Sequence, residues 1–504
     1  MIVAMAIILR RTYGGDAAIY LPYARNLADG HPFTFNPGEF SSGSTSPLWT
    51  VVLSLPYLVG LGYKGAKAFA ALWTGGAFLV SFVAARRVSG SALAAGSAAL
   101  WVVAVLPLYG LIMFESPLVV LLVALSVWLV ARLMERPERA WDMRGLTPIA
   151  IVWAALPLAR PEAAVLVPVE AAALVLAAAP VARRQAVRTA AAVALAALPS
   201  IAYYGYSLVH LGVPSTSAAG RALYLRETTT HRLGPLFLSA DAIDYIFSWP
   251  AIVAFVPGLA GLILLCRQTR ARAVGLVSLA GVASYVLLVT FVSPGSFDTA
   301  RYLLPVAPFV VAGVAVALAR LPMPHLRLAG VAVAAATLAV PAGQTIDGAR
   351  TFASRPYTFD TITQRSAAHI INRLARPGDR VLAYEVQSRY FLRPDVRVLS
   401  LDGITDGRVF PYEHPGRVAA FIRRYRPRFW IADTATDSDR RRPGVALRRY
   451  LQGSVLTTVV KRARMNPPGR RVLTGGIEFT LVAQRRTLPL SGGVWTMVFE
   501  LRYA

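Results

Sequence analysis

Gly15–Trp49, GDAAIYLPYARNLADGHPFTFNPGEFSSGSTSPLW, is a polar stretch set between apolar segments, and the interpretation of the whole chain depends on it. Asp16 is the first acid of the chain and follows soon after the first apolar segment. An ionisable side chain held at a membrane boundary is costly and usually serves a function. We therefore place the centre of the functional site at Asp16, in a first loop over residues 10–64.

The composition is that of a membrane protein. Of 504 residues, 56% are apolar and only 15% are charged, against roughly 25% charged residues in soluble domains. Apolar runs of about the length of a spanning helix recur at Pro117–Leu133, Ala163–Val181, Thr189–Val209, Ala251–Cys266 and Tyr302–Ala319. In lipid such runs must satisfy their own backbones as helices. The sequence therefore predicts a polytopic α-helical membrane protein with about eleven transmembrane helices.

The net charge of +26 raises the question of a nucleic-acid partner. The arginines stand in short loops and in the C-terminal third, which favours anionic lipid headgroups or lipid phosphates and disfavours nucleic acid. The single cysteine, Cys266, excludes an intramolecular disulfide, and the six histidines show no metal-ligand spacing. No cofactor is required by this pattern, although scattered carboxylates leave a divalent cation open.

Two sets of loops alternate along the chain. The first set collects Lys and Arg, at 86–87, 132–144, 183–188, 267–272 and 320–327. The second set holds Glu115, residues 160–162, the long segment 210–248 and the short segment 294–301. Because cytoplasmic loops collect Lys and Arg, we expect the first set inside and the second outside. Everything after about residue 345 is then outside as well.

Two apolar segments do not fit a simple count of spans. Pro47–Leu61 cannot cross if residues 86–87 are inside and Asp16 is outside, so we predict a helix at the external surface, joined to a true span at Ala66–Ala85. The alternative is an ordinary hairpin with a misplaced arginine pair. Met1–Leu9 covers only about 13 Å as a helix. Either the true start lies upstream or the first helix is incomplete.

Residues 345–504 change from long apolar runs to short alternating patterns. Strands are predicted at Arg380–Tyr384, Val396–Leu401, Arg428–Ala432, Ile477–Gln484 and Val494–Leu501. Amphipathic helices are predicted at Ser366–Ala375 and Arg417–Tyr425. We therefore divide the chain into a transmembrane domain, 1–344, and an extracytoplasmic α/β domain, 345–504. The second domain covers the active site, holds a polymeric acceptor or serves as a passive cap.

The first loop supplies the candidates for chemistry. A partly desolvated carboxylate at the outer membrane face can act as a general base on a sugar hydroxyl, which is the role we expect for Asp16. Asp29 ends a predicted helix, Ala17–Asp29, and lies well away from Asp16. The run Ser41–Ser46 offers hydroxyls for sugar or phosphate contacts, or forms a plain loop. From this loop the predicted sugar or acceptor pocket takes Tyr20, Glu39, Ser44 and Thr45.

Later loops add acids and cations at the same external level. Glu115 begins a span, and Glu162 stands beside Arg160, with which it either pairs or shapes the sugar pocket; all three are assigned to that pocket. Glu170 lies deeper in an apolar helix, where an acid needs a partner or a proton. Fixed cations stabilise the charge that develops on a leaving phosphate. The cations expected to hold a donor phosphate are Arg301, Arg221 and Lys64.

These motifs together resemble the GT-C superfamily of glycosyltransferases, which use polyprenyl-phosphate sugars; the nearest branch is that of the mycobacterial arabinofuranosyltransferases. The specific matches are Gly15-Asp16-Ala17-Ala18-Ile19, Tyr23-Ala24-Arg25-Asn26-Leu27, Phe35-Asn36-Pro37-Gly38-Glu39 and Thr45-Ser46-Pro47-Leu48-Trp49. Shorter matches follow in order at Phe114–Leu118, Arg160–Glu162, Leu211–Thr216, Arg301–Pro305 and Leu401–Asp406. The resemblance implies a catalytic aspartate and surface-lying helices in the first loop.

The chain departs from the family pattern at two positions. The family's paired aspartates are Gly15 and Asp16 here, and an acid that often follows the Pro-Gly-Glu turn is Ser42. If the first acid of the pair is the base, this chain lacks it, and if the second is, Asp16 suffices. With Ser42 in place of that acid, the donor or the acceptor can differ from those of the family.

The sequence thus predicts an inverting glycosyltransferase in the cytoplasmic membrane, multi-pass, with its C-terminal domain extracytoplasmic. It moves a sugar, arabinofuranose by resemblance, from a polyprenyl-phosphate donor to a glycan or lipid acceptor, with Asp16 as general base. The alternatives are a membrane transporter or lipid-binding protein, and a non-catalytic relative of the superfamily. Pro and Gly interruptions and Glu170 fit a transporter, but the inverted repeats typical of transporters are not visible in the sequence.

Overall fold

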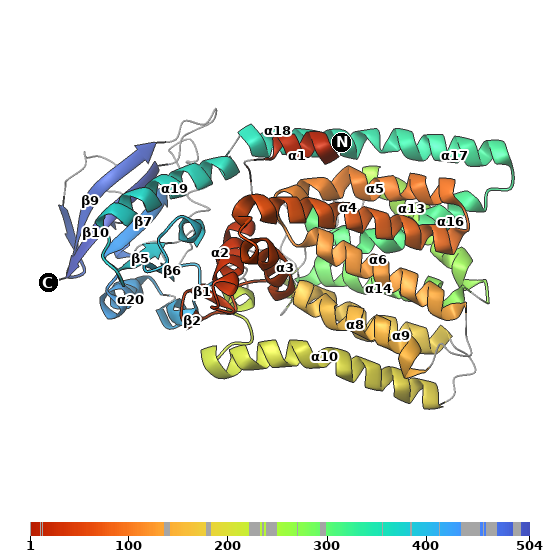
Figure 1. Ribbon diagram of the computed structural model, residues 1–504, viewed down its shortest axis with the longest axis horizontal. Helices are drawn as coiled ribbons and strands as arrows, with labels where there is room; N and C mark the ends of the chain where they lie inside the picture. Colours follow the sequence, from red (N-terminus) through yellow and green to blue (C-terminus); the bar gives the residue numbers. More distant parts are fainter. Residues whose placement is uncertain are drawn as a thin grey trace.

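The computed structural model places a helical bundle beside a mixed sheet that carries its own helices (Figure 1). The residues that it describes are 2–10, 12, 14–135, 142–177, 183–220, 232–233, 236–237, 249–269, 271–292, 299–354, 356–383, 386–412, 414–434, 454–456, 458–459, 471–486 and 495–503.

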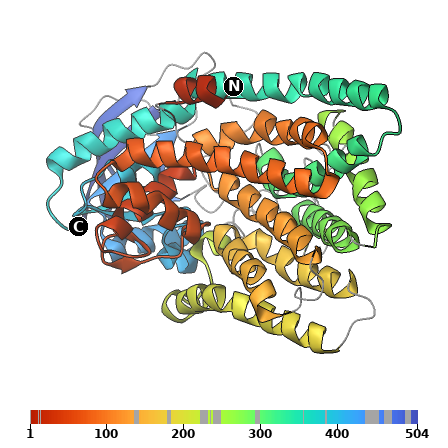
Figure 2. The same ribbon diagram turned by 45° about the vertical axis from the view of Figure 1, so that its right-hand side comes forward.

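The bundle is made mainly of helices that run side by side (Figures 1 and 2). They are α4 (Gly62–Ser89), α5 (Ala92–Leu111), α6 (Ser116–Met134), α8 (Met143–Ala159), α9 (Leu166–Ala177), α10 (Arg183–Leu211), α13 (Trp249–Cys266), α14 (Arg272–Val292), α16 (Ala307–Ala319) and α17 (Pro324–Thr337). The short helix α1 (Ile2–Ile8) packs beside α18 (Ala339–Ser354) at one flank (Figure 1).

Within the described part of the chain, six helices are long and apolar enough to cross a membrane, or seven if the bent α5 is one span. The prediction of a multi-pass helical membrane protein is therefore confirmed. The number eleven is not confirmed, because α8 and α13 contribute only shorter apolar helices. The predicted run Ala163–Val181 begins instead with a 3-10 turn at Pro161–Val165, so that α9 has 12 residues.

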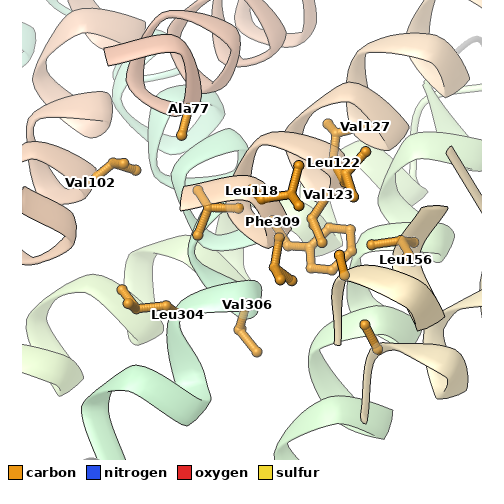
Figure 3. Close-up of a cluster of buried hydrophobic side chains, with 14 of the residues drawn as sticks. Ala77, Val102, Leu118, Leu122, Val123, Val127, Leu156, Leu304, Val306 and Phe309 are labelled. Atoms are coloured by element: carbon orange, nitrogen blue, oxygen red, sulfur yellow. The ribbon is translucent and has the colours of Figure 1, made fainter. Parts of the chain in front are cut away.

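An apolar core fills the centre of the bundle. Figure 3 shows part of it, where Leu118 and Val123 of α6 gather with Leu156 of α8 and Phe309 of α16. In lipid, helices associate through close packing rather than through the hydrophobic effect, and small residues permit the approach. A Cβ atom added to Gly261 of α13 would overlap the backbone of α16 at Gly313.

Several described helix ends that carry arginines lie at one end of the bundle, among them the end of α4 and the start of α10 (Figure 1). At the arginine-rich end, Arg87 Nε donates to Glu135 Oε1 at 2.8 Å, and Arg188 Nη1 donates to Asp142 Oδ1 at 2.9 Å. The other end carries the first loop and the C-terminal domain (Figure 1). Which of the two ends faces the cytoplasm stays a prediction from the arginine pattern.

The first loop lies across the end of the bundle, between the helices and the sheet (Figures 1 and 2). It folds into α2 (Ala17–Ala28), a hairpin of β1 (Thr34–Asn36) and β2 (Glu39–Phe40), and α3 (Pro47–Leu58). With 12 residues, α3 extends about 18 Å, well short of a ~30 Å hydrocarbon core. This length agrees with a surface helix, and α4 follows it directly.

The C-terminal domain contains a six-stranded sheet in the order β6-β5-β7-β10-β9-β8. Its strands are β5 (Arg380–Ala383), β6 (Arg397–Ser400), β7 (Phe429–Thr434), β8 (Arg471–Thr474), β9 (Ile477–Arg486) and β10 (Trp495–Tyr503). β5 pairs in parallel with β6 and β7, whereas β10 is antiparallel to β7 and β9. Five of these strands were predicted; β8 was not.

Both faces of the sheet are covered. Because side chains alternate along a strand, Trp430 of β7 packs with α20 (Val418–Tyr425), while Phe429 packs with α19 (Pro356–Leu374) on the other face. Tyr23 and Phe35 of the first loop join the second cluster. The first loop is thereby held against the C-terminal domain as well as against the bundle.

Candidate active site at the end of the bundle

A network of charged side chains connects the first loop to the bundle. Arg301 Nη2 donates to Asp16 Oδ2 at 2.5 Å and to the two carboxylate oxygens of Glu115 at 2.8 and 2.9 Å. Arg160 Nη1 donates to Glu115 Oε1 at 2.7 Å. Glu115 therefore bridges two arginines, and one of these also holds Asp16.

Helix ends bring these side chains together. Asp16 precedes α2 and Glu115 precedes α6, each at the N-cap position, while Arg160 stands at the C-cap position of α8. Acids at helix N-termini and cations at C-termini both interact favourably with the helix dipole. Arg301 belongs to the short helix α15 (Thr299–Leu303), just before the chain enters α16 through a 3-10 turn.

Burial separates the four charges into two kinds. The side chains of Glu115, Arg160 and Arg301 are 1%, 4% and 4% exposed, whereas Asp16 is 38% exposed. Burial alone would raise the pKa of Glu115, but the charges of Arg301 and Arg160 lower it by more, so that the pKa falls to about 2. A buried charge is tolerated when it is paired and hydrogen-bonded. Asp16 is thus the accessible acid of an otherwise buried ion network.

Aromatic rings complete the surroundings of the arginines. The Arg301 guanidinium carbon lies 3.9 Å from the centre of the Phe114 ring, and that of Arg160 lies 4.3 Å from the Tyr302 ring. Such contacts attract the cation to the ring face. A Cβ atom added to Gly14 would overlap Phe114, so the close approach of the first loop to this ring requires a glycine.

Three further residues predicted for the sugar pocket lie in or beside the network. Tyr20 donates its hydroxyl hydrogen to Glu115 Oε2 at 2.9 Å and shares a hydrogen bond of 2.5 Å with Thr45 Oγ1. Burial, followed by the charges of Glu115 and Asp16, raises the pKa of Tyr20, which keeps the phenol protonated as a donor. Glu162 lies 3.3 Å from Arg160 Nε, which is the pairing considered from the sequence.

Other predicted site residues make different contacts. Glu39 accepts from Arg397 Nη1 at 2.9 Å and from Arg408 Nη2 at 2.8 Å, both in the C-terminal domain. Ser44 Oγ and Thr50 Oγ1 are 2.8 Å apart within the first loop. Neither contact joins the Glu115 network.

The predicted phosphate-binding cations are less closely grouped than the residues around Glu115. Lys64 is exposed in the first turn of α4, and Arg221 lies outside the described residues. Lys67, one turn beyond Lys64, donates to the backbone carbonyl of Thr12 at the start of the first loop. Of the predicted cations that the structure describes, Arg301 alone contacts the Asp16 carboxylate.

Sequence reasoning missed the aromatic partners and the bridging role of Glu115. Phe114 directly precedes Glu115, and Tyr302 directly follows Arg301. An aromatic residue next to a predicted ionic residue is the signal that was available. Within the described ranges no group of three or more His, Cys, Asp or Glu side chains is placed to hold a metal ion.

Glu170 forms a separate cluster inside the bundle. Its Oε2 accepts hydrogen bonds from Ser126 Oγ and, at 2.9 Å, from Trp153 Nε1. The residue is fully buried. Among the described residues, the hydrogen-bond partners of Glu170 are neutral donors. The sequence analysis expected a partner for this buried acid, and these two donors are that partner.

Comparison with known proteins identifies the fold. No protein-family profile and no curated protein sequence matches the chain. It is similar to the crystal structure of ArnT from Cupriavidus metallidurans bound to undecaprenyl phosphate, with a TM-score of 0.60 and 15% identity over 98% of this chain and 96% of that one. The apo state of ArnT matches with a TM-score of 0.58 at 15% identity. The chain therefore has the fold of ArnT over almost its whole length.

Proposed function

We propose that this protein is an inverting glycosyltransferase that moves a sugar from a polyprenyl-phosphate donor to an acceptor hydroxyl. The observation that carries the proposal is Asp16, a half-exposed carboxylate fixed by a buried arginine where the first loop meets the bundle. A positioned carboxylate can take a proton from a reacting hydroxyl. Arabinofuranose as the sugar rests on the sequence resemblance.

The proposed step conserves atoms and charge. Asp16 takes the proton of the acceptor hydroxyl, whose oxygen forms a bond to the anomeric carbon of the sugar. The bond from that carbon to the phosphate oxygen breaks, and polyprenyl phosphate leaves with the electron pair. Attack from the face opposite the phosphate inverts the configuration. The Arg301 contact orients the carboxylate through a charge-assisted hydrogen bond from Nη2 to Oδ2.

A phosphate leaving group needs fixed cations, and Arg301 is the one that the structure places in contact with Asp16. We propose that Arg301 and Lys64, with Arg221 from the segment outside the described residues, meet the donor phosphate. Preorganised cations stabilise the negative charge that forms there. Lys67 is a further candidate, because it reaches the first loop from the same side of α4.

An apolar groove next to Arg301 suits the lipid part of such a donor. Leu303 and Leu304, two and three residues beyond Arg301, line it together with Trp101 of α5 and Phe255 of α13. The groove encloses about 80 Å³, below the ~300–1,000 Å³ of small-molecule sites, so we propose that it takes only the part of the isoprenoid chain nearest the phosphate. ArnT, whose fold the chain shares, has been crystallised with undecaprenyl phosphate.

Glu115, Arg160 and Glu162 would then form the wall of the sugar pocket, with Tyr20 and Thr45 behind them. Their mutual contacts hold the wall rigid before the donor arrives. Preorganisation of this kind lowers the reorganisation needed in the transition state. We no longer assign Glu39 and Ser44 to this pocket, because Glu39 contacts the C-terminal domain and Ser44 contacts Thr50.

We further propose the membrane arrangement. Eleven crossings arise if α5, α8 and α13 cross as well as the six longer helices, together with the segments that hold α1 and α9, each of which is too short to cross by itself. The arginine-rich end then faces the cytoplasm, and the C-terminal domain after residue 344 lies outside, over the active site. The acceptor, a glycan or a lipid, would be bound between this domain and the first loop.

The test is made with purified protein in liposomes. Radiolabelled polyprenyl-phosphate pentoses and hexoses are supplied with membrane glycolipid extracts, and lipid-linked sugars that copurify with the protein are identified by mass spectrometry. The proposal expects label to move from the donor to an acceptor, with release of polyprenyl phosphate. Donor binding without transfer would favour a non-catalytic relative, and transbilayer movement of the intact donor would favour a transporter.

A further inference from the structure

A polar cavity of about 390 Å³ lies between the first loop and the C-terminal domain, and its lining residues are distinct from those of the Asp16 network. The β1–β2 hairpin forms one wall, through residues that include Glu39 and Phe40. The end of α10 contributes His210, and the turn after β6 contributes Thr405, Asp406 and Arg408. Its volume falls within the range of small-molecule sites, ~300–1,000 Å³.

Hydrogen bonds hold the walls of this cavity in place. The Asn36 side chain donates to the carbonyl of Val398 at 2.9 Å and accepts from its amide at 2.8 Å. Ser41 Oγ donates at 2.5 Å to the carbonyl of Thr405. The Glu39 carboxylate bridges two arginines of the C-terminal domain. The cavity is therefore preformed, which lowers the cost of ordering on binding.

The Thr405 hydroxyl is an unusual feature of the lining. Thr405 is 2% exposed, and its Oγ1 meets no hydrogen-bond partner among the described residues. A buried hydroxyl without a partner costs about 1–3 kcal/mol, so such groups are normally satisfied. Thr405 lines the cavity, and rotation of its side chain toward the cavity would let a ligand hydroxyl supply the missing partner.

The charge balance of the lining favours a neutral ligand. Glu39 and Asp406 both contact Arg408, and Glu39 also pairs with Arg397, so the two carboxylates and the two arginines balance. The carboxylates accept hydrogen bonds but repel an anionic ligand. Hydroxyl groups are the donors that these oxygens would take from a neutral molecule.

An aromatic surface borders the same cavity. Phe40 lies with its ring edge-on to Tyr206, at 4.7 Å between centroids, and His210 stacks on Tyr206 at 3.8 Å. Phe40 and His210 line the cavity directly. Flat apolar rings beside convergent polar groups match the two faces of a sugar, which carries C–H groups on one side and hydroxyls at its edge.

From these features we infer that the cavity is a subsite for one or two neutral, hydroxyl-rich sugar units of the acceptor. The inference rests on the proposed function, because it names the class of acceptor that the transferase would hold. It also gives the C-terminal domain and the first loop a shared task. The Asp406 and Glu39 carboxylates bind hydroxyl edges, Phe40 contacts the apolar face, and Thr405 gains its missing partner.

The experiment uses the full-length protein in nanodiscs. Binding of neutral di- to tetrasaccharides of arabinose, mannose and glucose is followed by saturation-transfer NMR, with a uronic-acid oligosaccharide of the same length as the anionic probe. Thr405→Val, which keeps the shape of the side chain, should weaken neutral-sugar binding about five-fold through loss of one hydrogen bond. Phe40→Ala should weaken it about ten-fold.

The matched control is Thr474→Val on β8, which removes a threonine hydroxyl outside the cavity and should leave binding unchanged. Thermal unfolding verifies that each variant folds. Equal binding by wild type and both cavity variants, or tighter binding of the uronic-acid probe, overturns the inference.

Transfer kinetics separate this inference from the proposed function. If the wild type transfers sugar and the cavity variants show an unchanged acceptor KM, the subsite is wrong and the transferase stands. If neutral sugars bind in a Thr405-dependent manner while no transfer occurs, the subsite stands and the transferase is wrong. A raised acceptor KM with unchanged donor binding supports both.

Discussion

Glu115 and Glu170 are both buried acids of the bundle, but their partners differ in charge. Glu115 lies between Arg301 and Arg160 at the end of the bundle, where the network opens to the outside through Asp16. Glu170 lies inside the bundle and meets neutral donors. The difference indicates that a buried acid alone does not mark a reaction centre. An acid that shares its cation with an exposed carboxylate is the better sign.

The largest expected effect is on Glu115. Replacement by Ala leaves two buried arginines without their shared carboxylate, and breaking a buried ion pair costs about 3–5 kcal/mol. The free energy of unfolding, measured by denaturant titration in detergent, should fall by that amount. Asp16→Asn, which removes the exposed acid of the same arginine, is the matched control and should cost less than about 1 kcal/mol. Equal losses in the two variants would contradict the distinction.

The pH dependence of stability should follow the same residue. Burial raises the pKa of Glu115, but the charges of Arg301 and Arg160 bring it from the ordinary 4.5 to about 2. Because the folded pKa is depressed, the stabilisation is fully present above about pH 4.5 and is lost as the pH falls toward 2. In Glu115→Gln this part of the loss of stability at low pH should disappear. If the free energy of unfolding of wild type and variant falls equally below pH 4.5, Glu115 does not cause the pH dependence.

A smaller effect is expected where the first loop meets the C-terminal domain. Glu39→Gln removes the charge shared by Arg397 and Arg408, both partly exposed, and should cost about 1 kcal/mol at low salt. The loss should shrink at high salt because surface charges are screened. Asp395→Asn breaks the more exposed pair with Arg393 and serves as the control. A larger loss in the control would show that the Glu39 contacts do not hold the interface.

Glu170 should show the smallest effect. Gln keeps a carbonyl oxygen that can accept from Ser126 and Trp153, so Glu170→Gln should change the free energy of unfolding by less than about 1 kcal/mol and leave transfer intact. Glu170→Leu, which removes the acceptor and leaves two buried donors unsatisfied, should cost about 1–3 kcal/mol more. Loss of transfer in Glu170→Gln at full stability would place this acid in the reaction.

The sequence predicted where the site lies better than it predicted which of its side chains pair. The arginine pattern placed Asp16, Glu115, Arg160 and Arg301 at one end of the bundle, because helix direction reverses from span to span and loop charge follows it. Which of these groups pair could not be read from local patterns. The Glu39–Arg408 contact joins residues 369 positions apart, and only the packed fold brings them together.

The fold of the C-terminal domain shows the same limit. Alternation of apolar residues predicted β7 and β10, whose core is buried on both faces. β8 was missed because it is an edge strand with one buried residue in four. Edge strands carry few apolar residues, so alternation identifies them poorly.

The most direct test of the central claim compares sugar transfer by wild type and Asp16→Asn. Both proteins are placed in liposomes with the same radiolabelled polyprenyl-phosphate sugar and acceptor extract, and thermal unfolding establishes that the variant is folded. Loss of the general base should lower the transfer rate by about 10²–10⁴-fold. Transfer at the wild-type rate by the folded variant would contradict the assignment of Asp16.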